Sequence, residues 1–280
     1  AIETGRLRRA LALLDDEPLL SPEDLALLSW VSRYYQHPLG EVIAGALPVR
    51  LRRGERPLAL QRPGWQLTVE GAGQDPSALV RAPRQAEVLR LLQQTPGGAL
   101  PQDDIYLHMA PCRAVLQSLQ RKHWLSPCSV AHAVEDAAAD SSSGPALNAE
   151  QQAAAAVVMQ RLHGFDVFLL DGITGSGKTE VYLQLIQTML GLGRQVLVLV
   201  PEIGLTPQLK RRFRRRVPVA MTVLHSGMNQ AERELGWQQA RLGRARLVLG
   251  TRSAVFTPMP ELGLIIVDEE HDLSFKQQDG

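Results

Sequence analysis

The second half of the sequence predicts an α/β fold in which a parallel β-sheet is covered by helices on both faces. Apolar runs alternate there with amphipathic segments, as expected for strands that are buried on both faces. A glycine-rich loop separates the first apolar run from the helix after it, whereas the first half holds three short helical segments in close succession. The expected buried strands are Val167 to Leu170, Gln195 to Val200, Ala220 to Leu224, Ala245 to Leu249 and Leu264 to Val267.

Composition bounds the class of protein. The 280 residues are 45% hydrophobic and suffice for two or three ordinary domains. No apolar run approaches the ~20 residues that cross a bilayer, and the first residues do not resemble a signal peptide, so we expect a cytoplasmic protein without membrane contact. A net charge of +1 does not by itself indicate nucleic acid. Cys112 and Cys128 lie far apart without metal-ligand spacing, which favours free thiols over a disulfide or a zinc site.

The first half predicts two small domains. Ser21-Pro22-Glu23-Asp24 is a helix start, and a helix over Ser21 to Tyr35 is expected within a partial N-terminal DNA-binding domain, residues 1–76. Three helices and a trailing hairpin then predict a winged-helix domain, residues 77–132, which could bind DNA or protein. The expected helices are Arg84 to Gln94, Gln102 to Met109 and Cys112 to Lys122.

Small and polar residues then predict a linker, residues 133–147, before an α/β lobe that covers residues 148–280. In this lobe, Gly172 to Thr179 matches the phosphate-binding pattern G-x-x-x-x-G-K-[ST] between an expected strand and an expected helix. Such a match arises by chance in roughly one per cent of chains of this length. The loop backbone would hold phosphates, Lys178 would reach the β- and γ-phosphates, and Thr179 would bind Mg²⁺. The expected nucleotide-binding residues of the loop are Gly172, Thr174, Gly175, Ser176, Gly177, Lys178 and Thr179.

A pair of carboxylates follows the last expected strand. Leu264 to Val267 leads into Asp268-Glu269-Glu270-His271, so that the acidic pair stands at the carboxyl end of a strand. Asp268 would hold the Mg²⁺ ion, and Glu269 would polarise the attacking water as a general base. An acidic turn after a buried strand is the alternative, which the loop about 90 residues upstream disfavours. The expected catalytic residues are therefore Lys178, Asp268 and Glu269.

The lobe as a whole resembles a known family of DNA motors. Asp268 to His271 resembles motif II of the superfamily 2 helicases, whose core is a RecA-like lobe. The wider set of stretches resembles the PriA (primosomal protein N′) family of replication-restart helicases. These stretches are Val200 to Gln208, Leu224 to Gly227, Gly250 to Pro258 and Asp268 to Gln278, with looser matches at Tyr34 to Gly40 and Ala46 to Pro48.

The resemblance implies an ATP- and Mg²⁺-dependent 3′-to-5′ DNA helicase that acts at stalled replication forks in bacteria. Its expected partners are forked and single-stranded DNA, single-stranded DNA-binding protein and other primosome proteins. Gln151 would contact the adenine, and His271 would couple the nucleotide state to neighbouring groups. The residues expected to line the DNA path are Pro201, Thr206, Gln208, Gly250, Thr251, Arg252 and Ser253. Donors of this kind suit phosphate contacts that carry no sequence information.

The same resemblance implies parts beyond this chain, namely an extreme N-terminal segment, a second motor lobe with arginine fingers and a zinc element. We therefore expect the chain alone to hydrolyse ATP poorly, and zinc only in that C-terminal part. Another superfamily 2 motor, or a DNA or protein adaptor without catalysis, remains an alternative. The basic run Lys210 to Arg216 is either a solvated helix face or a surface that steers DNA. Fork-structure preference, partner identities and step size are not specified by the sequence.

Overall fold

The computed structural model of the 280-residue chain describes residues 15, 17–109, 112–131, 144–162, 164–173 and 175–275. The chain forms two compact units. Unit 1 comprises residues 1–58 and 134–280, and unit 2 comprises residues 59–133. The predicted linker, residues 133–147, lies largely outside the described residues, and so does Thr174 of the predicted phosphate-binding loop.

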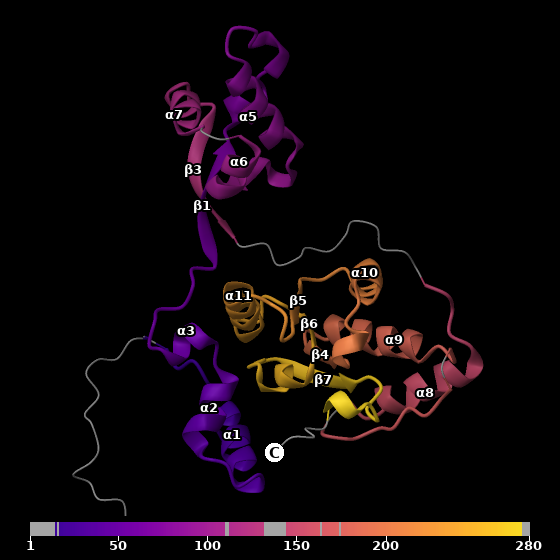
Figure 1. The fold of residues 1–280 in the computed structure, drawn as a ribbon. Coiled ribbons are helices and arrows are strands. Elements are labelled where there is room, and N and C mark those ends of the chain that lie inside the picture. Colours follow the sequence, from indigo (N-terminus) through magenta and orange to yellow (C-terminus); the bar gives the residue numbers. More distant parts are fainter. Residues whose placement is uncertain are drawn as a thin grey trace, which may run out of the picture. The chain divides into compact units, whose positions relative to one another are not determined.

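Unit 1 is built on a four-stranded sheet in the order β5-β6-β4-β7 (Figure 1). Every neighbouring pair is parallel. Its strands are β4 (Gln195–Leu199), β5 (Met221–Leu224), β6 (Leu247–Gly250) and β7 (Leu262–Val267). Its helices are α8 (Ala149–Met159), α9 (Lys178–Gly191), α10 (Pro207–Arg216) and α11 (Gln230–Arg241), with 3₁₀ turns η4 (Glu202–Gly204), η5 (Arg252–Phe256) and η6 (Leu273–Phe275). The parallel sheet and four of the five expected strands are confirmed.

Alternation along β4 shows why both faces of the sheet are covered. Val196 and Val198 pack with α9 and α10 in one cluster of buried side chains. Leu197 and Leu199 pack with α11 in a second cluster. Successive residues of a strand point to opposite faces, so a strand that is apolar at every position must be covered on both sides.

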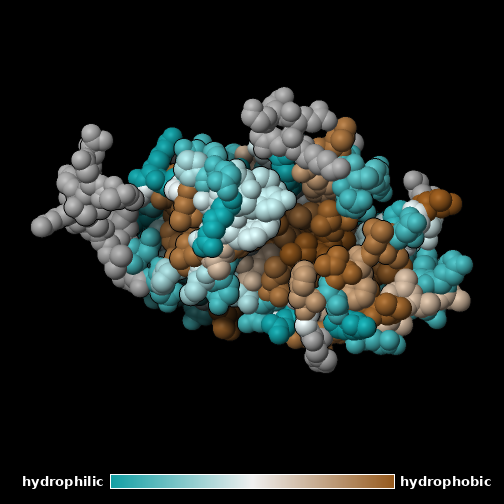
Figure 2. Space-filling view, turned by 90° about the horizontal axis from the view of Figure 1, so that it is seen from below, coloured by the Kyte–Doolittle hydropathy of each residue, from teal (hydrophilic) through white to brown (hydrophobic). Residues whose placement is uncertain are grey.

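Two expectations about the edge of this sheet were wrong. Val167 to Leu170 is not a strand, because apolar composition favours β structure but a strand also needs a ladder partner, and no pairing is described there. Strand β7 therefore lies at the described edge of the sheet and is only partly buried, with Ile265 47% and Val267 43% exposed. In Figure 1 this strand lies on the lower side of the sheet, and Figure 2, which views the molecule from below, shows a broad hydrophobic area.

Unit 1 also contains the N-terminal helices α1 (Pro22–Tyr34), α2 (Leu39–Ala46) and α3 (Val49–Arg52). Helix α1 begins as the sequence predicted, because Ser21 and Asp24 form a reciprocal capping box. Leu28 and Leu51 pack with Trp237 of α11 in one buried cluster. The N-terminal helices are thereby attached to the α/β lobe by apolar contact.

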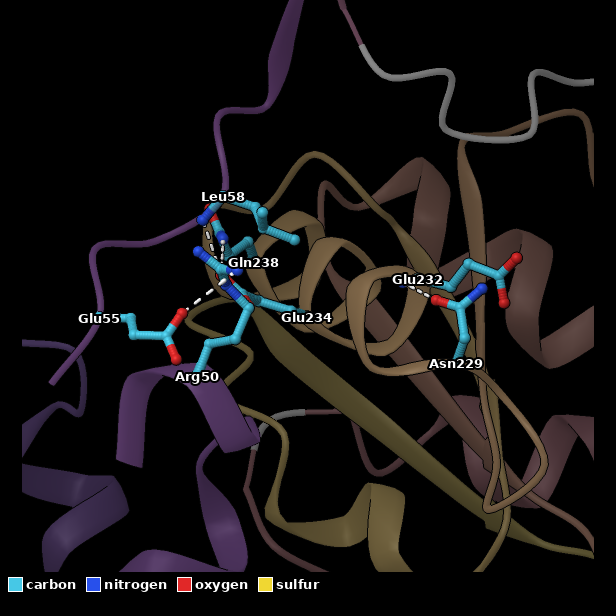
Figure 3. A network of polar contacts seen from close by, with 7 residues as sticks. All are labelled: Arg50, Glu55, Leu58, Asn229, Glu232, Glu234 and Gln238. Atoms are coloured by element: carbon cyan, nitrogen blue, oxygen red, sulfur yellow. Dashed lines mark hydrogen bonds and ion pairs between the residues drawn. The ribbon is translucent and has the colours of Figure 1, made fainter. Parts of the chain in front are cut away.

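A buried carboxylate reinforces this attachment (Figure 3). The Glu234 side chain of α11 is fully buried, and its Oε1 atom accepts hydrogen bonds from the backbone nitrogen of Leu58 at 2.6 Å and from Gln238 Nε2 at 3.1 Å. Its Oε2 atom lies 3.4 Å from Arg50 Nε, in an ion pair whose orientation makes no hydrogen bond. Glu55 contacts the same guanidinium group from the outside, at 3.2 Å.

Unit 2 holds a three-stranded antiparallel sheet in the order β2-β1-β3. Its strands are β1 (Gln61–Leu67), β2 (Ala99–Pro101) and β3 (Leu125–Ala131). Its helices are α4 (Val69–Ala72), α5 (Pro83–Gln94), α6 (Gln102–His108) and α7 (Arg113–Arg121), with 3₁₀ turns η2 (Pro76–Ala78) and η3 (Pro96–Gly98). Apolar residues of α5, α6 and α7 pack with Leu125 of β3 in one core.

The three helices of the expected winged-helix domain are present, with two differences in the strands. A single described strand, β3, follows the third helix instead of a hairpin, and it pairs with β1 from before the first helix. Strand pairing depends on which strands lie close together in the folded chain. Local sequence therefore does not reveal that β1 pairs with β3. The structural unit consequently begins at residue 59, within the segment that the sequence assigned to the N-terminal domain. No described helix has the length and hydrophobicity to span a membrane.

Candidate nucleotide and DNA site

The phosphate-binding loop ends in helix α9, as its sequence predicts. Gly175 and Gly177 have φ values of 84° and 83°, in the left-handed region that glycine adopts without strain. The Lys178 amine, in the first turn of α9, donates a 2.5 Å hydrogen bond to the Gly172 carbonyl across the loop. Backbone N–H groups at a helix N-terminus favour anions, so the described loop has the form of a phosphate cradle around this amine.

Gln151 lies against this loop. Its Nε2 donates to the Ser176 carbonyl at 2.9 Å, and its Oε1 accepts from the Asn148 backbone in the capping box of α8. A Cβ atom on Gly177 would approach Gln151 Nε2 to 2.4 Å. The structure thus brings the expected adenine-contacting residue to the phosphate-binding loop, where Gly177 is needed for its φ value of 83°.

Asp268 directly follows strand β7, and its carboxylate interacts electrostatically with Lys178 of the loop. Its backbone nitrogen donates to the Leu199 carbonyl at 2.9 Å, which continues the pairing of β7 with β4 for one more residue. Burial raises the pKa of Asp268, and the charge of Glu269 raises it further. A hydrogen bond with Tyr182 and the charge of Lys178 oppose this shift. The charge of the loop lysine is thus felt by the strand-end carboxylate, although the two residues lie about 90 positions apart in sequence.

Tyr182 is a site residue that our motif reading missed. Burial of its side chain, together with the negative charge of Asp268, raises the pKa of Tyr182 to about 12. Tyr182 follows Lys178 by four residues and Thr179 by three, a spacing that places side chains on one face of a helix. That spacing was the signal in the sequence that could have revealed it.

Glu269 and His271 lie next to each other on the exposed side of the turn after β7. Glu269 has φ 49°, an uncommon value for a residue with a side chain, and it ends the extended backbone. His271 Nε2 lies 3.6 Å from Glu269 Oε2, a contact that becomes an ion pair when the histidine is protonated. The side chains are 77% and 44% exposed. The sequence specified no partner for His271, and the structure places the expected general base beside it.

The residues expected along the DNA path follow strands β4 and β6. Parallel strands place their carboxyl ends at one edge of a sheet, so these segments share an edge with Asp268. Gln208, Arg252 and Ser253 are exposed there. Thr206 is also exposed, but its hydroxyl accepts from the Leu209 backbone as the N-cap of α10. The other three expected residues are buried, namely Pro201, Gly250 at the end of β6, and Thr251.

The basic run Lys210 to Arg216 is partly used within the fold. Arg212 and Arg216 of α10 lie 2.7 and 2.8 Å from the two carboxylate oxygens of Glu180 in the first turn of α9. Burial opposes ionisation of Glu180, yet its pKa is lowered overall by the hydrogen bond from Arg212 and by the positive charges of both arginines. Part of the run therefore holds α10 against the helix that carries the phosphate-binding loop.

The donor set fits Mg²⁺ better than a transition metal. The Asp268 carboxylate and the Thr179 hydroxyl are hard oxygen ligands, and Mg²⁺ commonly takes only one or two protein oxygens beside phosphates and water. Among the described residues, no group of three or more His, Cys, Asp or Glu side chains is arranged to hold a metal ion. Thr179 and Asp268 thus carry the kind of oxygen donors that Mg²⁺ prefers.

Comparisons with known proteins agree with this geometry. The family model described as DEAD/DEAH box helicase matches residues 148–280, and the one described as 3′DNA-binding domain (3′BD) matches residues 1–48. The first of these, with the parallel sheet, confirms the P-loop NTPase fold of the lobe.

The relatives named Replication restart protein PriA include the three that follow. The protein of Haemophilus influenzae is 41% identical over 99% of this chain, which covers 38% of that relative. The protein of Synechocystis sp. is 46% identical over 69% of this chain, and that of Bacillus subtilis is 47% identical over 48%. The chain covers 23% and 17% of those two proteins. It therefore spans less than two fifths of the length of the relatives named here.

Proposed function

Because the chain belongs to the PriA family of replication restart proteins, we propose that it is the nucleotide-binding part of an ATP-driven 3′-to-5′ DNA helicase that acts at stalled forks. The observation that carries the proposal is the glycine-rich loop closed by Lys178 at the start of α9, with the charge of Lys178 lowering the pKa of Asp268 at the end of β7. The substrates would be forked and single-stranded DNA. Single-stranded DNA-binding protein and other primosome proteins would be its partners, within the bacterial cytoplasm where the chromosome lies.

At the nucleotide, Lys178 would leave the Gly172 carbonyl and bind the β- and γ-phosphates, which are better partners for an ammonium group than a neutral carbonyl. Thr179 and Asp268 would hold Mg²⁺, which would neutralise phosphate charge. Glu269 would orient and deprotonate the attacking water, and its neighbour His271 would report the nucleotide state to groups around it. Gln151, already against the loop, would turn toward the adenine.

Nucleotide binding is tested by titrating a fluorescent ATP analogue into the chain with Mg²⁺ present. Lys178→Ala should abolish binding and leave the fold intact, because the amine neutralises phosphate and fills no core. Lys122→Ala, which removes a lysine from unit 2, is the matched control and should bind as the unchanged chain does. Glu269→Gln should keep binding but remove hydrolysis in the full-length enzyme. Undiminished binding by Lys178→Ala would contradict the assignment of the loop.

At the DNA, the exposed Gln208, Arg252 and Ser253 would contact phosphates along the edge of the sheet that also carries Asp268, together with Thr206. The buried Thr251 and the packed Pro201 and Gly250 would shape the path through their backbone. Such contacts ignore base sequence, and they release counterions, so that binding weakens steeply with salt.

The DNA contacts are tested by measuring affinity for single-stranded DNA of several sequences over a range of salt concentrations. Arg252→Ala should weaken binding about equally for all sequences and lower the salt slope by about one. Arg244→Ala is the control, because this arginine is also exposed but precedes β6 and so lies at the opposite edge of the sheet. Equal effects of the two substitutions would exclude the proposed path.

A further inference from the structure

Strand β7 has one open side. In the order β5-β6-β4-β7, its only ladder partner among the described strands is β4. The Asp268 nitrogen, one residue after β7, donates to the Leu199 carbonyl of β4. Because alternate residues of a strand direct their N–H groups to the same neighbour, the N–H groups of Ile265 and Val267 point to the open side. Unpaired edge groups of this kind are a ready template for another strand.

An apolar segment, residues 164–170, lies near this open side. One groove is lined by Phe168 of the segment and by Leu264 of β7. Leu170 and Leu264 also pack against α8 and α9 within one apolar cluster. The two stretches of chain thus share the same helices, with a groove where they approach each other.

Both stretches have one covered and one uncovered side. In β7, Ile266 is buried in the cluster with α9, whereas Ile265 and Val267 are 47% and 43% exposed. In the other segment, Val167 and Leu169 are 81% and 82% exposed, and the residues that alternate with them are less so. Alternation with a period of two is typical of strands in a sheet whose second face is not yet covered.

The direction of the segment also suits the sheet. Helix α9 connects it to β4, and a connection through a helix within one sheet normally joins parallel strands. Strand β7 is parallel to β4 as well. A single strand placed between β7 and residues 167–170 could therefore form parallel ladders with both.

We propose that the groove between β7 and residues 167–170 receives one further parallel β-strand, from the part of the longer protein that this chain does not include. The chain covers 38% of its Haemophilus influenzae relative, so a protein of that length has further sequence to supply the strand. Pairing with residues 167–170 would fix the stretch that leads into the phosphate-binding loop at Gly172. The inference goes beyond the proposed function, which the ATP titration tests separately.

A second copy of the chain fits this place less well. A symmetric dimer joins the same patch of two copies, so it would bring two β7 edges together. Residues 167–170 of each copy would then stand between these edges. A strand from elsewhere in the same protein meets no such obstacle.

Hydrogen exchange at the Ile265 and Val267 amides tests the proposed strand. In the 280-residue chain these N–H groups face solvent and should exchange rapidly. In the full-length protein they should exchange at least about tenfold more slowly, because a ladder protects them. The Val196 amide, which donates to the Arg246 carbonyl within the sheet, is the control and should be protected in both proteins.

A pair of substitutions tests the same hydrogen bonds. Ile265→Pro removes the outward N–H group, whereas Ile265→Ala shortens the side chain and keeps that group. Proline is tolerated where a strand N–H faces solvent, but not inside a sheet. The two variants should therefore melt within about 2 °C of each other in this chain. In the full-length protein the proline variant should melt at least about 5 °C lower than the alanine variant.

The exchange data distinguish the possible occupants. Rapid exchange of both amides in the full-length protein, with Val196 protected, would overturn the proposal. Protection in this chain that grows with its concentration would identify a second copy as the occupant. Protection in this chain at every concentration would assign the edge to its own residues, and either result would also overturn the proposal. None of these outcomes bears on ATP binding, so the proposed function is judged independently.

Discussion

Replacing Glu234 by Ala should detach the N-terminal helices from the α/β lobe. The side chain is fully buried and joins Arg50, Leu58 and Gln238. Its removal leaves the Leu58 N–H group and one face of the Arg50 guanidinium without their partner. Leaving the Leu58 N–H group without its acceptor costs about 1 to 3 kcal/mol, whereas Arg50 is 37% exposed and keeps Glu55 as a partner.

The loss should appear in two measurements. A unit of about 200 residues loses roughly 2 to 4 °C of its melting temperature per kcal/mol, so the first thermal transition should fall by about 2 to 12 °C. Hydrogen exchange at the Leu58 amide should accelerate, because that N–H loses its acceptor.

Glu232→Ala is the matched control, two residues earlier on the exposed side of α11 (Figure 3). A substitution there should change stability by no more than about 0.5 kcal/mol. Equal melting shifts in the two variants, or an unchanged exchange rate at Leu58, would refute the argument that this carboxylate attaches the N-terminal helices.

Three further changes probe the two units. Glu180→Gln should lower stability by about 1 to 2 kcal/mol near neutral pH. Because the folded-state pKa of Glu180 is lowered, the lost stability is present above its ordinary pKa and disappears as the pH falls through the folded value, so melting of the two proteins should converge in acid. Gly177→Ala should weaken ATP binding in the same fluorescence titration, since φ is 83° and an alanine is strained there; unaltered affinity would exclude that strain. Gly71→Ala should destabilise unit 2 in thermal melts, because the new Cβ meets the Trp124 carbonyl at 2.0 Å, and an unchanged melt would show that α4 can shift.

The elements that the sequence located correctly are those whose signals are local. Ser21 with Asp24 is a capping box that fixes a helix start within four residues of chain. The four expected strands that the structure confirmed are short apolar runs between turns. The phosphate-binding loop is likewise a contiguous sequence pattern. The elements that it misplaced, the strand at Val167 to Leu170 and the hairpin after α7, depend on which partner is nearby in space.

By itself, the sequence determined the parallel sheet covered on both faces, the phosphate-binding loop that ends at Thr179, and the acidic pair at Asp268, because spacing along the chain suffices for each. Only the tertiary structure decided that β1 pairs with β3, that Glu234 is buried beneath Leu58, and that the charge of Asp268 acts on Tyr182. These interactions join residues between about 60 and 180 positions apart. Pairing across such distances is chosen by packing and by the satisfaction of buried polar groups, which no local pattern of residues encodes.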